Sequence, residues 1–75
     1  MNKENRKQLE RAVELIEEAK GIVEEIKDGE QEKYDNFTEG LQATERGERF
    51  MEVVDLLDSA YSGLEEAVDN INESF

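Results

Sequence analysis

The 75-residue sequence contains no cysteine and no histidine. Without cysteine there is no disulfide framework and no thiolate metal site to reinforce so short a chain. The two absences together remove the commonest general base, the thiol nucleophile and the main transition-metal ligands. Neither a phosphate-binding glycine loop nor a dinucleotide fingerprint is present. We therefore expect no enzymatic activity, no metal and no cofactor.

One acidic segment has a spacing that partly matches a calcium-binding loop. Asp28, Glu30 and Glu32 alternate as the first ligands of such a loop do. Lys33, however, stands where that loop requires glycine. The spacing therefore does not favour a calcium site.

Long apolar runs are also missing from the sequence. No run approaches the roughly 18 residues of a membrane-spanning helix, and the N-terminus lacks the apolar core of a signal peptide. We expect a soluble, intracellular protein with no membrane partner. A chain of this length has room for one domain, residues 1–75, which buries only about 60% of its unfolded surface. Oligomerisation is then the remaining source of stability.

Negative charge dominates the chain and is unevenly distributed. There are 21 acidic and 9 basic residues, for a net charge of −12. Residues 1–11 carry four basic and two acidic groups, whereas residues 50–75 carry seven acidic groups and no basic group. Binding to nucleic acid depends on neutralising phosphates with Lys and Arg, so direct contact with nucleic acid is not expected. The charge favours a basic protein partner, such as a DNA- or RNA-binding protein.

The first third of the chain has the apolar periodicity of an amphipathic helix, expected over residues 3–28. Its apolar positions step three and four residues apart, which places them on one face of a helix; they are Leu9, Ala12, Ile16, Ala19, Val23 and Ile26, flanked by Val13, Leu15 and Ile22. The opposite face is expected to hold the glutamates together with Lys20 and Lys27. Asp28 and Gly29 mark the expected end, because glycine readily adopts the left-handed conformation of a helix C-terminus.

The last third is more regular and predicts a second helix over residues 45–73. Three of every seven positions are apolar, the width of a helix that contacts more than one neighbour; they are Phe50, Val53, Val54, Leu57, Ala60, Tyr61, Leu64, Ala67, Val68, Ile71 and Phe75. Two such helices joined by a linker form an antiparallel hairpin. A lone hairpin cannot cover two wide stripes, and leaving them in water forfeits several kcal/mol at about 0.8 kcal/mol per CH₂.

We therefore expect an all-α fold in which two long antiparallel helices form a hairpin, and two hairpins form a homodimeric four-helix bundle. The residues expected in the oligomer core are Leu9, Ile16, Val23, Phe50, Leu57, Tyr61, Leu64 and Ile71. The orientation of the two hairpins, parallel or antiparallel, stays open. The small residues Ser59, Ser62 and Gly63 lie around Tyr61, where they either set the interhelical distance or receive the helix of a partner.

The expected linker, residues 29–44, is longer than the two to eight residues that most helix connections in bundles need. Asn36 and Thr44 are candidate N-caps, and a short helical turn is expected from Thr38 to Gln42. Tyr34, Phe37 and Leu41 are expected to fold over one end of the bundle. An alternative is that the linker forms a recognition surface, whose residues would be Tyr34, Asp35, Asn36, Phe37, Arg46 and Arg49.

The run from Tyr34 to Gly47 has the pattern aromatic-Asp-Asn-x-x-Glu-Gly-Leu-Gln-x-Ser/Thr-Glu-Arg-Gly. It resembles the linker of an uncharacterised family of small acidic helical-hairpin proteins from bacteria, their phages and other mobile elements. Thr38 departs from the proline that is typical of its position. The resemblance covers nearly the whole chain and implies a phage or mobile-element setting in the cytoplasm of a bacterial host cell. It implies no activity and no functional residues.

Two functional hypotheses follow. In the first, the protein is an inhibitor or adaptor that offers a nucleic-acid-like surface to a basic host protein; the surface would be the acidic residues of the second helix, Glu52, Asp55, Asp58, Glu65, Glu66, Asp69 and Glu73. In the second, the protein has a structural or assembly role as an oligomerisation module, and the charges only keep it dissolved. Salt distinguishes the two, because only the first interaction weakens sharply with ionic strength.

Overall fold

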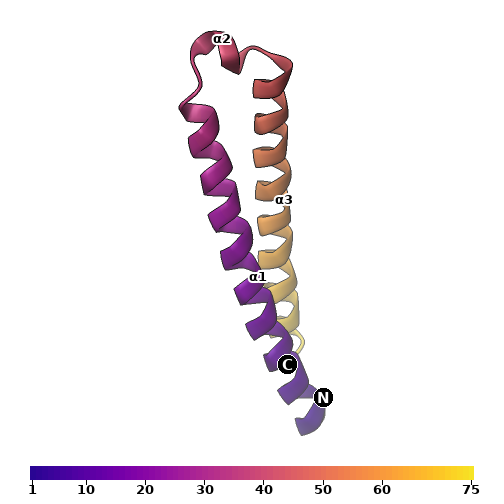
Figure 1. Cartoon of the computed structure of the whole chain (residues 1–75). Helices are drawn as coiled ribbons and strands as arrows, with labels where there is room; N and C mark the ends of the chain where they lie inside the picture. Colours follow the sequence, from indigo (N-terminus) through magenta and orange to yellow (C-terminus); the bar gives the residue numbers. More distant parts are fainter.

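The computed structural model describes residues 1–75 and contains only helices. Helix α1 spans Lys3–Asp35, the short helix α2 spans Glu39–Gln42, and helix α3 spans Glu45–Glu73. The all-α prediction is therefore confirmed. Helices α1 and α3 lie side by side with opposite directions, and α2 crosses between them at one end (Figure 1). The result is a rod of 58 × 15 × 12 Å.

Side-chain caps explain where the helices begin. The Asn2 carboxamide oxygen accepts a hydrogen bond from the Asn5 amide at 2.7 Å. Thr38 and Thr44 cap α2 and α3 in the same way, accepting from the Leu41 and Gly47 amides at 3.3 Å each. Each cap satisfies an amide that has no partner within its helix. Thr44, one of the two candidates predicted from the sequence, is thus the N-cap of α3.

The first helix runs further than predicted, to Asp35 instead of Asp28. Gly29 has no positive φ and continues the helix, so the expected stop signal has no effect there. The added turns contain an ion pair of 3.2 Å between Lys33 and Glu30. The positive charge of Lys33 in the last turn also stabilises the helix, because the C-terminal end of a helix carries partial negative charge. Asn36, expected as an N-cap, is instead the C-cap of α1.

The contact between α1 and α3 is narrow. Only Gly47, Val54 and Val68 are buried. The residues expected in an oligomer core are all half-buried along the contact between the two helices; they are Leu9, Ile16, Val23, Phe50, Leu57, Tyr61, Leu64 and Ile71. Two helices alone therefore shield these side chains only in part.

Two ion pairs across the contact define how the helices are aligned. Lys27 Nζ lies 3.3 Å from Asp58 Oδ1, and Lys20 Nζ lies 3.9 Å from Glu65 Oε1. The residue numbers add to 85 in both pairs, as they do when two antiparallel helices keep one register. With this register α1 begins beyond the end of α3, and its first turns project past the C-terminus (Figure 1). None of the helices is apolar over a length that would cross a membrane.

Candidate functional site

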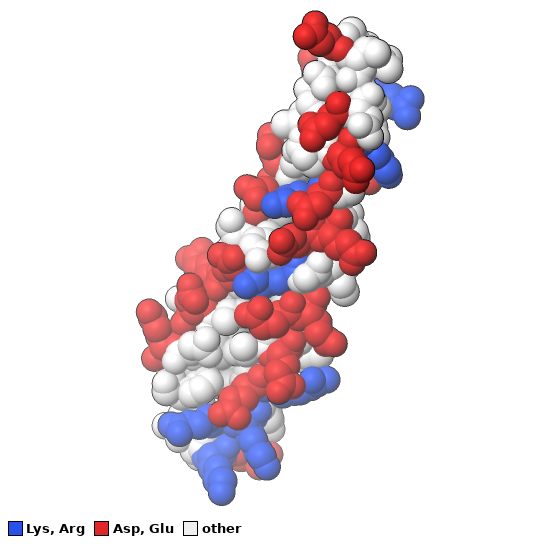
Figure 2. Space-filling model, turned by 90° about the vertical axis from the view of Figure 1, so that its left-hand side faces the viewer, with Lys and Arg blue, Asp and Glu red and all other residues white.

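The acidic residues of α3 form an exposed row along the helix. All seven predicted surface residues are exposed in the structure; they are Glu52, Asp55, Asp58, Glu65, Glu66, Asp69 and Glu73. We call this row the acidic face. Viewed from the α1 side, carboxylates are distributed along the whole rod between uncharged areas, while basic groups gather at the end where the N-terminus lies (Figure 2).

Basic groups of the same chain neutralise part of the acidic face. Lys27 pairs with Asp58, Lys20 with Glu65, and Arg49 with Glu52 at 3.2 Å. The carboxylates of the face that have no ion pair within the chain are Asp55, Glu66, Asp69 and Glu73. These four groups are available to a positively charged partner.

Lys20 and Lys27 do not lie on the solvent face where the sequence analysis placed them. Their side chains are only 15% and 23% exposed, and their ammonium groups lie 5.2 and 5.8 Å from the centre of the Tyr61 ring. The lysine stems pack along the helix contact while the charged ends reach carboxylates at its edge. A signal for this position exists in the sequence, because Val13, Lys20, Lys27 and Tyr34 are spaced seven apart and share one helical position.

Burial raises the pKa of the Tyr61 phenol above its ordinary value, and the nearby Glu24 and Glu65 carboxylates raise it further. Both causes disfavour the negatively charged phenolate. Tyr61 is therefore neutral at ordinary pH and half-buried in the helix contact.

The linker end contains a small aromatic cluster. The Phe37 ring lies edge-on to Phe50 with centroids 5.2 Å apart, and Tyr34 lies 6.2 Å from Phe37. The Arg46 guanidinium lies 5.6 Å from the centre of the Phe37 ring. Because Tyr34 and Phe37 are half-buried in this cluster, they cover the end of the helix contact as expected. Leu41 does not join them and is 47% exposed.

The other residues of the predicted linker surface are exposed to solvent. Asp35 and Asn36 are exposed at the end of α1, and Arg49 is exposed while paired with Glu52. The structure thus divides the six linker residues into the half-buried aromatics Tyr34 and Phe37 and four exposed polar residues, Asp35, Asn36, Arg46 and Arg49. Arg46 is accessible to a partner although its guanidinium lies over the Phe37 ring.

Helix α2 is attached to α3 through Gly47. The Gln42 side-chain amide donates to the Tyr34 carbonyl at 3.2 Å, and the Thr44 hydroxyl donates to the Leu41 carbonyl at 2.6 Å. Gly47 is buried against this turn, where the Leu41 and Gln42 carbonyls leave no room for a side chain. The sequence analysis did not identify this role, and the only local signal was a glycine three residues after the Thr44 cap.

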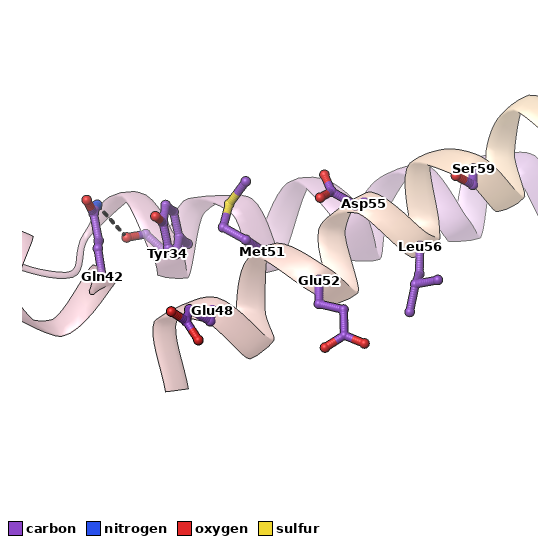
Figure 3. Close-up of a pocket in the computed structure, with 8 residues that line it drawn as sticks. All are labelled: Tyr34, Gln42, Glu48, Met51, Glu52, Asp55, Leu56 and Ser59. Carbon is purple, nitrogen blue, oxygen red and sulfur yellow. Dashed lines mark hydrogen bonds between the residues drawn. The ribbon is translucent and has the colours of Figure 1, made fainter. Parts of the chain in front are cut away.

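A shallow hollow of about 450 Å³ lies beside the aromatic cluster (Figure 3). Its lining includes the apolar side chains of Tyr34, Met51 and Leu56, and the carboxylates of Glu48, Glu52 and Asp55 add negative charge. The hollow continues the acidic face toward the linker. Its open shape and charge suit a basic side chain of a protein better than a small apolar ligand.

No group of three or more acidic residues has the geometry to bind a metal ion. Asp28, Glu30 and Glu32 lie within the continuous helix α1 and not in a loop. Comparison with protein-family models, with curated proteins and with solved structures finds no match for the chain.

Proposed function

We propose that the protein is a non-enzymatic, homodimeric protein-binding module that presents the acidic face of α3 to a basic partner protein. The observation that carries the proposal is the set of unpaired carboxylates on that face. Asp55, Glu66, Asp69 and Glu73 are exposed and have no basic partner in the chain. Their charge is free to attract a positively charged protein surface, and such attraction speeds association and selects partners by sign.

The length of the acidic face supports a nucleic-acid-like role. From Glu52 to Glu73 the helix rises about 32 Å at 1.5 Å per residue, close to the roughly 34 Å of one turn of duplex DNA. Seven carboxylates over that length give one acidic group per roughly 4–5 Å, and the four without an ion pair give one per roughly 8 Å, compared with about 3.4 Å along one DNA strand. Such a surface fits the basic groove of a DNA- or RNA-binding protein, as an inhibitor that imitates DNA would.

The setting of this activity is also a proposal. Supported by the linker resemblance, the proposed setting is the cytoplasm of a bacterial host cell, with the protein encoded by a phage or another mobile element. A basic host protein, such as a nuclease, repressor or defence protein, is then the expected target.

A pair of charge-reversal variants tests the acidic face. In the first variant Asp55, Glu66, Asp69 and Glu73 are replaced by lysine. In the control the same change is made at four exposed glutamates of α1, namely Glu10, Glu18, Glu25 and Glu32. Both variants have the same net charge, so they differ only in where the charge is lost.

Immobilised wild type and both variants are incubated with bacterial lysate at low and high salt. We expect a basic nucleic-acid-binding protein to bind the wild type and the α1 control, to be lost from the α3 variant, and to elute as salt screens the charges. Equal capture by both variants, or a partner insensitive to salt, would reject the acidic face as the binding surface.

An assembly role is the second candidate. It is favoured by the nearly absent core, since a chain with three buried residues has little apolar burial of its own, and association with other chains would add to it. Light scattering on the same sample measures the mass: a homodimer that captures no basic protein supports an assembly module without inhibitory activity. A monomer would reject the homodimer in both candidates.

A further inference from the structure

Large apolar side chains remain exposed along the middle of the rod. Leu15, Ile22 and Ile26 of α1 and Leu56 of α3 are between 48% and 59% exposed. They are not scattered, because Leu15 and Ile22 are seven residues apart and Ile26 follows by four, which places them on one strip of α1. Ala60 and Gly63 continue the strip of Leu56 on α3 at the same spacing, and both are exposed.

The two strips lie on the same side of the α1/α3 contact. Successive residues turn by about 100° around a helix, so Leu15 and Ile22 lie just before the contact residues Ile16 and Val23. Leu56 and Gly63 likewise lie just before Leu57 and Leu64, whereas Asp58 and Glu65 lie just after them. Ion pairs join Asp58 and Glu65 to lysines of α1 across one side. Because the helices are antiparallel, the α1 strip with Leu15 and Ile22 lies next to the α3 strip with Leu56 and Gly63. Both strips are on the side of the contact that faces away from these ion pairs.

We call Leu15, Ile22, Ile26, Leu56, Ala60 and Gly63 the bare face. None of the six is charged, in a chain of which 40% is charged. A second copy of the chain also carries a net charge of −12, and on most surfaces it would bring carboxylates together. The bare face is where two copies can approach without that repulsion, and its small residues permit close packing.

The exposed area matches what a dimer needs. The chain of 8.6 kDa exposes 5560 Å², whereas a folded monomer of that mass exposes about 4,700 Å² by the usual scaling with mass. The excess is about 860 Å². A standard protein interface buries about 800 Å² on each partner, so covering one face with a second copy would remove the excess.

We infer that a second copy packs on the bare face and completes a four-helix bundle. The inference rests on the homodimer of the proposed function and names its interface. The interface differs from the residues that the sequence analysis assigned to the oligomer core, because Leu9, Ile16, Val23 and their equivalents on α3 are engaged mainly between α1 and α3 of one chain. The residues just before them in sequence meet the second copy.

Charge determines the orientation of the two copies. The first turns of α1 project past α3, with Arg6 lying 5.7 Å from the ring of the terminal Phe75. These turns hold the four basic residues of segment 1–11. An antiparallel dimer places them beside the α2 end of the second copy, near Glu39, Glu45 and Glu48, which are exposed. A parallel dimer would place the two basic segments together, so the antiparallel form is favoured.

Single-cysteine variants test the interface, because the natural chain has no cysteine and every cross-link is then between chains. Ala60→Cys lies at the centre of the bare face, and Ser62→Cys lies two residues away on the same helix and outside it. Both substitutions are small and both sites are exposed. With a short bismaleimide at micromolar protein, Ala60→Cys is expected to cross-link at least tenfold faster. Equal rates, or faster cross-linking of Ser62→Cys, would overturn the assignment of the bare face as the interface. The homodimer itself is tested separately, by the mass of the wild type.

A second pair of variants uses mass as the readout. Ile22→Glu introduces charge into the bare face, and Leu41→Glu introduces the same charge at a residue of similar exposure in α2. Light scattering should give half the wild-type mass for Ile22→Glu and the full dimer mass for Leu41→Glu. A dimeric Ile22→Glu would reject the interface, and a monomeric wild type would reject the homodimer itself.

A third cysteine variant tests the orientation of the two copies. Gln8→Cys lies in the projecting turns of α1, and in an antiparallel dimer it should cross-link poorly to Gln8→Cys of the second copy. Efficient cross-linking would reject the antiparallel form.

Discussion

Replacing Gly47 with alanine should destabilise the protein, although alanine usually stabilises a helix. Gly47 lies in the first turn of α3, buried against the end of α2. An added Cβ would lie 2.6 Å from the Leu41 carbonyl oxygen and closer still to that of Gln42. Ordinary contact begins near 3.4 Å, so the backbone of α2 would have to move by about 1 Å to clear the nearer oxygen.

The expected cost follows from this displacement. Overpacking a well-filled site costs about 1–3 kcal/mol. Moving α2 also disturbs the Thr44 cap and the Thr44 hydrogen bond to Leu41, and loss of a cap costs about 1 kcal/mol. Alanine returns about 1 kcal/mol through its higher helix propensity. The net result is a destabilisation of about 1–3 kcal/mol.

Urea unfolding followed by circular dichroism measures this difference. Gly21→Ala is the matched control, because no atom lies within 4 Å of its added Cβ, and it should gain about 1 kcal/mol. All samples need the same protein concentration, since the stability of the proposed dimer would depend on it. With a slope of about 1 kcal/mol per molar urea, the two midpoints should move in opposite directions by about 1 M or more. A Gly47→Ala midpoint at or above that of the wild type would refute the tight contact between α2 and α3.

Two further outcomes test the linker cluster and the helix contact. Phe37→Ala should lower the free energy of unfolding by about 2 kcal/mol, which is less than the roughly 3–5 kcal/mol for a fully buried Phe. Leu41→Ala, at an exposed position, should lower it by under about 1 kcal/mol. If Phe37→Ala instead reduced partner binding at unchanged stability, Phe37 would belong to a recognition surface. The raised pKa of Tyr61 means that the folded state holds the phenolic proton more tightly than the unfolded state, so this contribution to stability is present below the ordinary pKa of about 10 and is lost as pH rises through the folded value. An ultraviolet titration of the Tyr34→Phe variant, which leaves Tyr61 as the one tyrosine, should show ionisation at lower pH when the protein is unfolded in urea; equal curves would contradict the packed position of Tyr61.

Local signals in the sequence were sufficient for the helices and most of their starts. The apolar period of residues 45–73 and the Thr44 cap placed α3 within its observed bounds. The turn expected from Thr38 to Gln42 is α2 with its cap. These features depend on neighbours within one or two turns, and such neighbours are visible in the sequence. The end of α1 was misjudged at Gly29, because glycine permits a helix to stop but does not require it.

The sequence by itself therefore determined an all-helical chain, the excess of negative charge and the acidic row of α3. Only the tertiary structure decided which side of each helix is covered. It placed Lys20 and Lys27 in the helix contact, left Leu41 exposed, and brought Ile22 and Leu56 onto one bare face. The physical reason is that an apolar stripe wider than one contact has two sides, and the register of α1 against α3 decides which side meets the neighbouring helix and which stays in solvent.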